Sequence, residues 1–143
     1  MSAELYLLDT SALFTLMEDE SGADRVQTVL LEGLAYLPWP VLLETYYITE
    51  RKQGRTEADR RYALIKQLPA TLLWDMDEPT LLTAARLKAA YRLSLADALI
   101  AAFAARQKAI LLHKDPELEV LTDYVSLEAL PYKIAEGEGD IDS

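Results

Sequence analysis

The sequence of 143 residues contains no cysteine, which excludes disulfide bonds and thiolate metal ligands. It contains a single histidine, His113. A zinc site is not expected, because such sites usually draw on several histidine or cysteine ligands. No apolar run approaches the roughly 20 residues needed to span a bilayer. The N-terminal segment MSAELYLLDTS has neither a basic region nor a long apolar stretch, so we expect a cytoplasmic protein without a secretory signal.

Basic residues are also scarce, with 14 Lys and Arg against 24 Asp and Glu and a net charge of −10. Such a chain binds nucleic acid poorly by charge alone, which disfavours a scaffold that coats DNA or RNA. A nuclease stays open, because carboxylates that bind cations and an acidic tail remote from the site would both inflate the count of negative charges near the substrate. We predict one domain over residues 1–135, followed by an acidic, solvated and disordered tail at 136–143.

Short apolar segments alternate with longer segments of helical periodicity. The alternation predicts crossover connections and a central parallel sheet, an α/β class. The segments LYLL and AILL are continuously apolar, which is typical of strands covered on both faces. The predicted strands are 4–8, 34–37, 71–74, 109–112 and 124–126. The predicted helices are 12–17, one opening at Ser21, 40–54, 56–68, 78–89, 95–107 after the N-cap candidate Ser94, and a short one at 115–121.

Four acidic residues stand inside apolar segments of this pattern: Asp9, Glu44, Asp97 and Asp115. Apolar flanks indicate partly buried carboxylates, and a buried carboxylate is costly unless it is compensated. A hard divalent cation compensates several carboxylates at once.

The predicted topology brings these acids together. Asp9 directly follows the first strand, and Asp115 follows the fourth by two residues. Because parallel strands end at one edge, neighbouring strands would bring both carboxylates there, and the first helical turns carrying Glu44 and Asp97 can start at that edge. Four such carboxylates repel one another, and Mg²⁺ or Mn²⁺ would relieve the repulsion.

Metal-activated water and phosphodiester hydrolysis are the chemistry that such a site favours. Thr10 and Ser11 are helix N-cap candidates, and either hydroxyl could position a water molecule or a carboxylate. Taken singly, each acid could instead be a helix cap, a turn residue or a solvated helix residue.

Two other functions stay open. The first is a Mg²⁺-dependent phosphatase or phosphotransfer domain. A covalent phosphatase usually needs a second Asp two residues after the first, where Ser11 stands, and a receiver domain needs an acid at Leu8. The second is a catalytically idle binding module, against which the intact set of four acids argues.

The segments LYLLDTSAL, SLADALIAAFA and LLHKDPELE, together with Glu44, resemble the PIN domain over residues 4–130. The closer resemblance is to VapC-type toxin ribonucleases of type II toxin–antitoxin systems. It implies a three-layer α/β/α sandwich and endonucleolytic cleavage of RNA that depends on Mg²⁺ or Mn²⁺. It also implies that the acidic quartet of the family is Asp9, Glu44, Asp97 and Asp115, with Thr10 or Ser11 as its hydroxyl.

One position departs from the resemblance. Many members carry Thr or Ser two residues before the last aspartate, where this chain has His113. The histidine could hydrogen-bond a phosphate or a water molecule, or it could simply be buried at the strand end. Glu119 is a further acid near this segment, which we interpret as a surface residue rather than a site residue.

RNA would have to be attracted by few basic groups. The candidates are one stretch and a lysine beside the site, namely Arg51, Lys52, Arg55, Arg60, Arg61 and Lys114. A solvated helix surface is the alternative interpretation. Tyr46 and Tyr47 could stack on bases, although tyrosines beside Ile48 are more often packing residues.

The resemblance also implies an antitoxin whose C-terminal segment lies along an apolar groove between the early helices. Candidate groove residues, which could equally be core residues, are Leu13, Phe14, Val26, Leu30 and Tyr47. It further implies a homodimer, for which the alanine-rich helix or the helix at 81–87 could supply the contact.

Overall fold

The computed structural model of the protein describes residues 4–133, so the predicted tail at 136–143 lies outside the described residues. Five strands form one sheet in the order β3-β2-β1-β4-β5, and every neighbouring pair is parallel. The strands are β1 (Tyr6–Leu8), β2 (Ala35–Pro38), β3 (Thr71–Leu73), β4 (Ile110–His113) and β5 (Leu127–Ala129). The predicted α/β class with a parallel sheet is confirmed.

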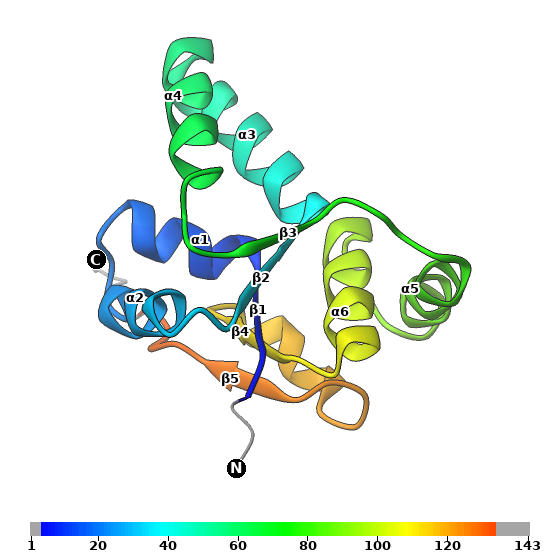
Figure 1. Ribbon diagram of the computed structural model, residues 1–143. Helices are drawn as coiled ribbons and strands as arrows, with labels where there is room; N and C mark the ends of the chain where they lie inside the picture. Colours follow the sequence, from blue (N-terminus) through cyan, green and yellow to red (C-terminus); the bar gives the residue numbers. More distant parts are fainter. Residues whose placement is uncertain (1–3, 134–143) are drawn as a thin grey trace, which may run out of the picture.

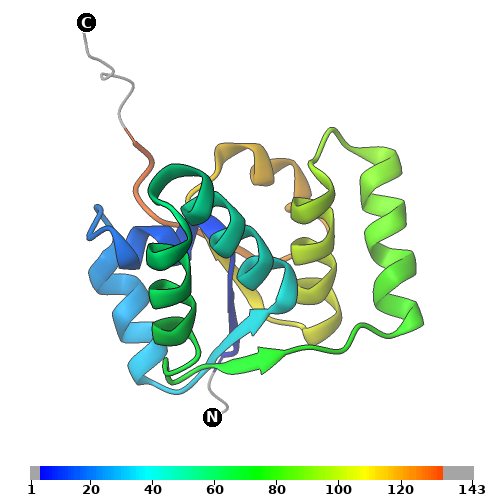
Figure 2. The same ribbon diagram turned by 90° about the horizontal axis from the view of Figure 1, so that it is seen from above.

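Helices cover both faces of the sheet and make the predicted sandwich. Figure 1 shows α1 and α2 on one side of the strands and α5 and α6 on the other. Figure 2 shows α3 between α4 and α6, both of which it contacts. The helices are α1 (Thr10–Met17), α2 (Ala23–Leu31), α3 (Trp39–Gln53), α4 (Arg55–Ile65), α5 (Glu78–Ala90), α6 (Leu95–Gln107) and the 3₁₀ helix η1 (Pro116–Leu121). None of the helices in this described part of the chain is long and apolar enough to cross a membrane.

The two strands predicted to be central are almost entirely buried. Leu7 and Leu8 of β1, like Leu111 and Leu112 of β4, have no exposed surface. These strands are direct neighbours, with Leu8 opposite Leu112, so both end at the same place. The carboxyl ends of β1 and β4 therefore bring the residues that follow them together, as the sequence predicted.

The small residues of α6 serve the interior of the molecule. Ala98, Ala101, Ala102 and Ala104 are fully buried, which lets the helix lie close to its neighbours. These alanines are covered by the core and cannot contact a second copy of the chain, while a dimer contact through the rest of α6 or through α5 stays a prediction.

Element boundaries differ from the predictions by a few residues. The last strand begins at Leu127 instead of at residue 124, because a turn follows η1 and delays the pairing with β4. The second helix begins at Ala23 behind Gly22, whose backbone φ of 104° is in the left-handed region that favours glycine. The predicted N-cap Ser94 is confirmed, since its side chain accepts the backbone N–H of Asp97.

Candidate active site

The four acidic residues found in the sequence line one pocket of about 300 Å³ at the carboxyl ends of β1 and β4. Its lining consists of these acids, three hydroxyl side chains and two apolar side chains, namely Asp9, Glu44, Asp97, Asp115, Thr10, Ser11, Ser94, Phe14 and Ile48. Asp9 and Asp115 follow the neighbouring strands β1 and β4, while Glu44 and Asp97 come from α3 and α6. Helical connections between the parallel strands bring these four residues to the same edge of the sheet.

Asp9 is the most deeply placed acid, with 3% of its surface exposed. Its backbone N–H still donates to the carbonyl of Leu112, while its side chain already caps α1 by accepting the N–H of Ala12 at 2.8 Å. Thr10 and Ser11 are therefore inside the helix, and the prediction that one of them is the N-cap is wrong. The Asp9 carboxylate takes that place because the residue stands in the extended conformation that a cap requires.

The two hydroxyls hold carboxylates in place. The Ser11 hydroxyl donates to Asp9 at 2.7 Å and 2.9 Å from its two oxygens, and it accepts the backbone N–H of Lys114 at 2.8 Å. The Thr10 hydroxyl donates to Glu44 at 2.6 Å. Ser11 thus joins the ends of β1 and β4, and Thr10 joins α1 to α3.

Glu44 and Asp97 occupy different helical turns. Because α3 begins at Trp39, Glu44 lies in its second turn and not in the first turn that the sequence suggested. Asp97 lies in the first turn of α6, as predicted. Both side chains, like that of Asp115, are partly buried.

Burial and mutual repulsion weaken the acidity of this cluster. Burial raises the pKa of Asp9 to about 7, against the opposing hydrogen bonds from Ser11 and Ala12 and with further contributions from the charges of Asp97 and Asp115. Burial also raises the pKa of Asp97 to about 6, assisted by the charges of Asp115 and Glu44. The acids therefore interact electrostatically across the pocket.

The donor chemistry of the pocket fits a hard divalent cation, because every polar side chain that lines it offers oxygen. A cation would also oppose the effects that raise the pKa of Asp9 and Asp97. Among residues 4–133, however, no three or more His, Asp or Glu side chains are gathered closely enough to hold an ion. The pocket therefore offers oxygen ligands and a surplus of negative charge suited to a divalent cation, but its acids do not form a complete coordination shell.

His113 has no exposed surface, which confirms its interpretation as a buried histidine at a strand end. Its Nδ1 atom accepts the backbone N–H of Asp115 at 3.0 Å. Glu119 is not part of the pocket, and its side chain is 44% exposed, in agreement with the surface interpretation. Nothing in the sequence indicates that Glu119 lies next to His113, yet its Oε2 is 3.3 Å from Nε2 of the histidine.

Most of the basic stretch is engaged with neighbouring acids. Arg60 and Arg61 both pair with Glu57, and Arg61 also reaches Glu18. Arg55 pairs with Glu50, while Arg51 lies over the ring of Tyr47. These contacts agree with the interpretation of the stretch as helix surface.

Lys114 does not face the acidic pocket. Its side chain is 5% exposed, and its ammonium donates to the carbonyl of Ser21 at 2.8 Å and lies 3.4 Å from Glu20. Adjacency in sequence to Asp115 suggested a cation beside the site, and this suggestion is wrong. The lysine side chain thus points toward the turn between α1 and α2.

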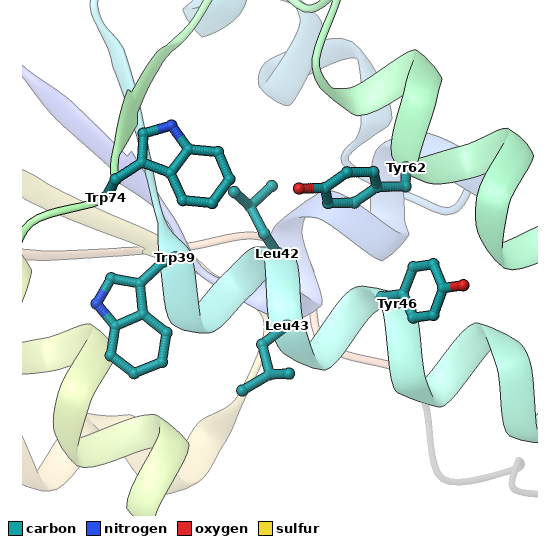
Figure 3. Close-up of a pocket in the computed structure, with 6 residues that line it drawn as sticks. All are labelled: Trp39, Leu42, Leu43, Tyr46, Tyr62 and Trp74. Carbon is teal, nitrogen blue, oxygen red and sulfur yellow. The ribbon is translucent and has the colours of Figure 1, made fainter.

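A separate apolar hollow of about 520 Å³ lies beside α3. Figure 3 shows the rings of Trp39 and Trp74 at one end, those of Tyr46 and Tyr62 at the other, and Leu42 and Leu43 between them. The Tyr46 ring packs edge-on against Tyr62 and its hydroxyl donates to Asp59, which agrees with the packing interpretation of this tyrosine. The hollow could not be predicted from the sequence, because its residues come from α3, from α4 and from the segment after β3.

Three of the residues proposed to bind an antitoxin are in the core. Leu13 and Val26 have no exposed surface, and Leu30 is 3% exposed, so their role as groove residues is wrong. Phe14 lines the acidic pocket, and Tyr47 is 38% exposed on α3. A groove between α1 and α4 does exist, lined by Leu16, Met17, Arg60, Arg61, Leu64, Ile65 and Leu68.

Comparison with known proteins gives one family. The PIN domain matches residues 6–123 of the chain. No curated protein sequence matches it.

Several solved structures share the fold at low sequence identity. VapBC2 from Rickettsia felis, bound to a promoter DNA fragment, is 14% identical with a TM-score of 0.74, covering 89% of this chain and 99% of that chain. Mycobacterium tuberculosis VapC20, a toxin that cleaves the sarcin–ricin loop, is 15% identical with a TM-score of 0.68, covering 88% and 99%. A toxin–antitoxin complex from Klebsiella pneumoniae is 16% identical with a TM-score of 0.63, covering 90% and 99%.

The raised pKa of Asp9 predicts how stability depends on pH in metal-free protein. The folded state binds a proton that the unfolded state has lost between pH about 4 and pH about 7, so stability falls as pH rises through this window. The variant Asp9→Asn removes the penalty and keeps an N-cap side chain. We expect it to exceed the wild type in unfolding free energy by about 1–3 kcal/mol at pH 8, and to lose this advantage near pH 4.

Urea unfolding in the presence of a chelator measures this difference at both pH values. The matched control is Asp24→Asn, on the exposed first turn of α2. It should not reproduce the gain at pH 8. Equal stability of Asp9→Asn and the wild type at pH 8 would show that the Asp9 carboxylate carries no burial penalty.

Proposed function

Because the chain belongs to the PIN domain family, we propose that it is a metal-dependent endoribonuclease that hydrolyses RNA phosphodiester bonds, and that it acts as the toxin of a toxin–antitoxin pair. The observation that carries the proposal is the convergence of Asp9, Glu44, Asp97 and Asp115 on one pocket. The fold of VapC20, described as cleaving the sarcin–ricin loop, supports RNA as the substrate class.

The proposed ion is Mg²⁺ or Mn²⁺, held by oxygens of these four acids. When bound, it would supply an activated water molecule and stabilise the departing oxygen. The rest of the work falls to side chains of this chain. Ser11 and the N–H of Ala12 fix the orientation of the Asp9 carboxylate, and Thr10 does the same for Glu44. Phe14 and Ile48 give the pocket an apolar wall.

The alternatives are weaker on chemical grounds. In a covalent phosphatase an acid would stand at position 11, whereas here the Ser11 hydroxyl is committed to Asp9 and Lys114. An idle binding module has no need for a buried acid whose pKa is raised to about 7, since burying it is costly.

We predict that Asp9→Asn and Asp97→Asn each lower the rate of RNA cleavage by more than about 100-fold, because the electrostatic assistance of a bound metal is worth several kcal/mol. A chelator should abolish cleavage by the wild type, and Mg²⁺ or Mn²⁺ should restore it. The measurement is cleavage of total RNA by purified protein, read as new RNA termini.

The control Asp24→Asn removes one negative charge from α2 and should cut like the wild type. Melting temperatures of both site variants should be no lower than that of the wild type, which separates lost chemistry from lost folding. Normal cleavage by either site variant would contradict the proposal. Hydrolysis of p-nitrophenyl phosphate without RNA cleavage would favour the phosphatase alternative.

We propose further that a partner antitoxin binds in the groove between α1 and α4, instead of the buried positions first considered. The groove offers apolar side chains beside two arginines, which suits a segment with apolar and acidic residues. Leu64 lines it and is 49% exposed.

The variant Leu64→Glu should therefore weaken the complex with an antitoxin encoded next to this gene, measured by co-purification from cells that express both proteins. Leu31→Glu is the matched control, because Leu31 is 74% exposed on α2 and lies outside the groove. Equal losses in both variants, or none in either, would contradict this binding site.

The proposed homodimer requires an exposed apolar surface other than the alanines of α6. Leu43 and Trp74 at the hollow are 56% and 52% exposed, and Leu81 of α5 is 49% exposed. We expect sedimentation velocity to show a dimer for the wild type and a monomer for Leu43→Lys, because a desolvated ammonium would oppose association. Leu31→Lys should leave the dimer intact, and a monomeric wild type would refute the proposal.

A further inference from the structure

His113 is the last residue of β4, and its side chain is enclosed at a point where the chain turns toward the acidic pocket. The Nδ1 atom accepts the backbone N–H of Asp115 at 3.0 Å. A histidine nitrogen that accepts carries no proton, so the proton of a neutral ring is on Nε2.

The opposite edge of the ring is also held. Nε2 lies 3.3 Å from Oε2 of Glu119, without the alignment of a hydrogen bond, and Glu119 accepts the hydroxyl of Tyr132 at 2.6 Å. On the backbone, the carbonyl of His113 accepts the N–H of Leu130 at 2.7 Å. Glu119 of η1 therefore lies against the Nε2 edge of the imidazole, while the bond from Leu130 holds the backbone of His113 in place.

Beyond β4, successive backbone N–H groups donate hydrogen bonds to side chains. The N–H of Lys114 donates to Ser11, that of Asp115 to His113, and that of Glu117 to the carboxylate of Asp115 at 3.0 Å. Asp115 is also the N-cap of η1. The Asp115 carboxylate is therefore attached to a backbone segment whose N–H groups are held by hydrogen bonds.

We propose that His113 is a positioning residue, whose Nδ1 holds the backbone amide of Asp115 and thereby places the Asp115 carboxylate at the mouth of the pocket. The consequence for catalysis rests on the proposed ribonuclease function, while the positioning itself does not. The alternative is that the imidazole merely fills space.

The chemistry of the position supports an acceptor role. A threonine or serine side chain commonly accepts the backbone N–H two residues later, in a turn that its hydroxyl closes. His113 makes this same bond with a ring nitrogen. His113 therefore provides a hydrogen-bond acceptor at the position where Thr or Ser is common, but the acceptor is a ring nitrogen instead of a hydroxyl.

The first test uses the fact that the chain has one histidine. Full-length protein labelled uniformly with ¹⁵N gives a two-bond proton–nitrogen correlation spectrum of this single ring, and the same sample reports hydrogen exchange at the amide of Asp115. We expect Nδ1 to be without a proton and Nε2 to carry one, and the amide of Asp115 to be protected from hydrogen exchange. A proton on Nδ1, or an unprotected Asp115 amide, would overturn the inference.

The second test compares His113→Thr with His113→Val, which have the same shape and differ in one hydroxyl. Both variants leave the same cavity, so space filling predicts equal behaviour. We expect exchange of the Asp115 amide to be about fivefold faster in the valine variant, as follows from the loss of one hydrogen bond. For RNA cleavage we expect kcat to be about fivefold lower in the valine variant than in the threonine variant, with KM unchanged.

Equal exchange of the Asp115 amide in the two variants would overturn the positioning role. If the wild-type protein cuts no RNA, the proposed function fails, and the exchange comparison still decides the role of His113. If either variant does not fold, the spectrum of the wild-type ring decides it alone.

Discussion

The Asp9 carboxylate is buried where β1 ends and α1 begins, and the arrangement of the pocket depends on how it is compensated. Across residues 4–133 it makes no ion pair, and its hydrogen bonds come from the hydroxyl of Ser11 and the N–H of Ala12. These two donors offset only part of the cost of burial, so the pKa stays raised to about 7. A positive charge beside such a buried carboxylate would stabilise its ionised form, which the protein's own groups stabilise only in part.

The acids come from elements far apart in the sequence, and hydrogen bonds of hydroxyl and backbone N–H groups connect these elements. Thr10 joins Asp9's helix to Glu44 on α3, and Ser11 joins it to the backbone after β4. The acids are thus held near one another by neutral donors instead of by arginine or lysine. Neutral donors leave the net negative charge of the pocket in place, which is the condition under which a divalent cation binds most strongly.

Much of this could be predicted from the sequence, since the central strands are continuously apolar, Asp9 and Asp115 follow strands, and Asp97 lies in the first turn of a helix. Parallel strands necessarily deliver Asp9 and Asp115 to one edge once β1 and β4 are neighbours. The direction of individual side chains was not predictable in this way. Lys114 adjoins Asp115 and yet packs toward Ser21, and three proposed groove residues, Leu13 among them, are core residues. Tertiary packing decides the direction of each side chain, and the helical periodicity of the sequence carries no information about it.

The distribution of positive charge limits how RNA would be recognised. Arg55, Arg60 and Arg61 are paired with glutamates on their own or adjacent helices, and Lys114 is buried against Glu20. With a net charge of −10, long-range attraction of a polyanion is weak. Binding energy must then come from short-range contacts at the pocket, where any cation held by the acids would reverse the local field. Under the proposed function, the same four carboxylates would then serve both to place the RNA and to cut it.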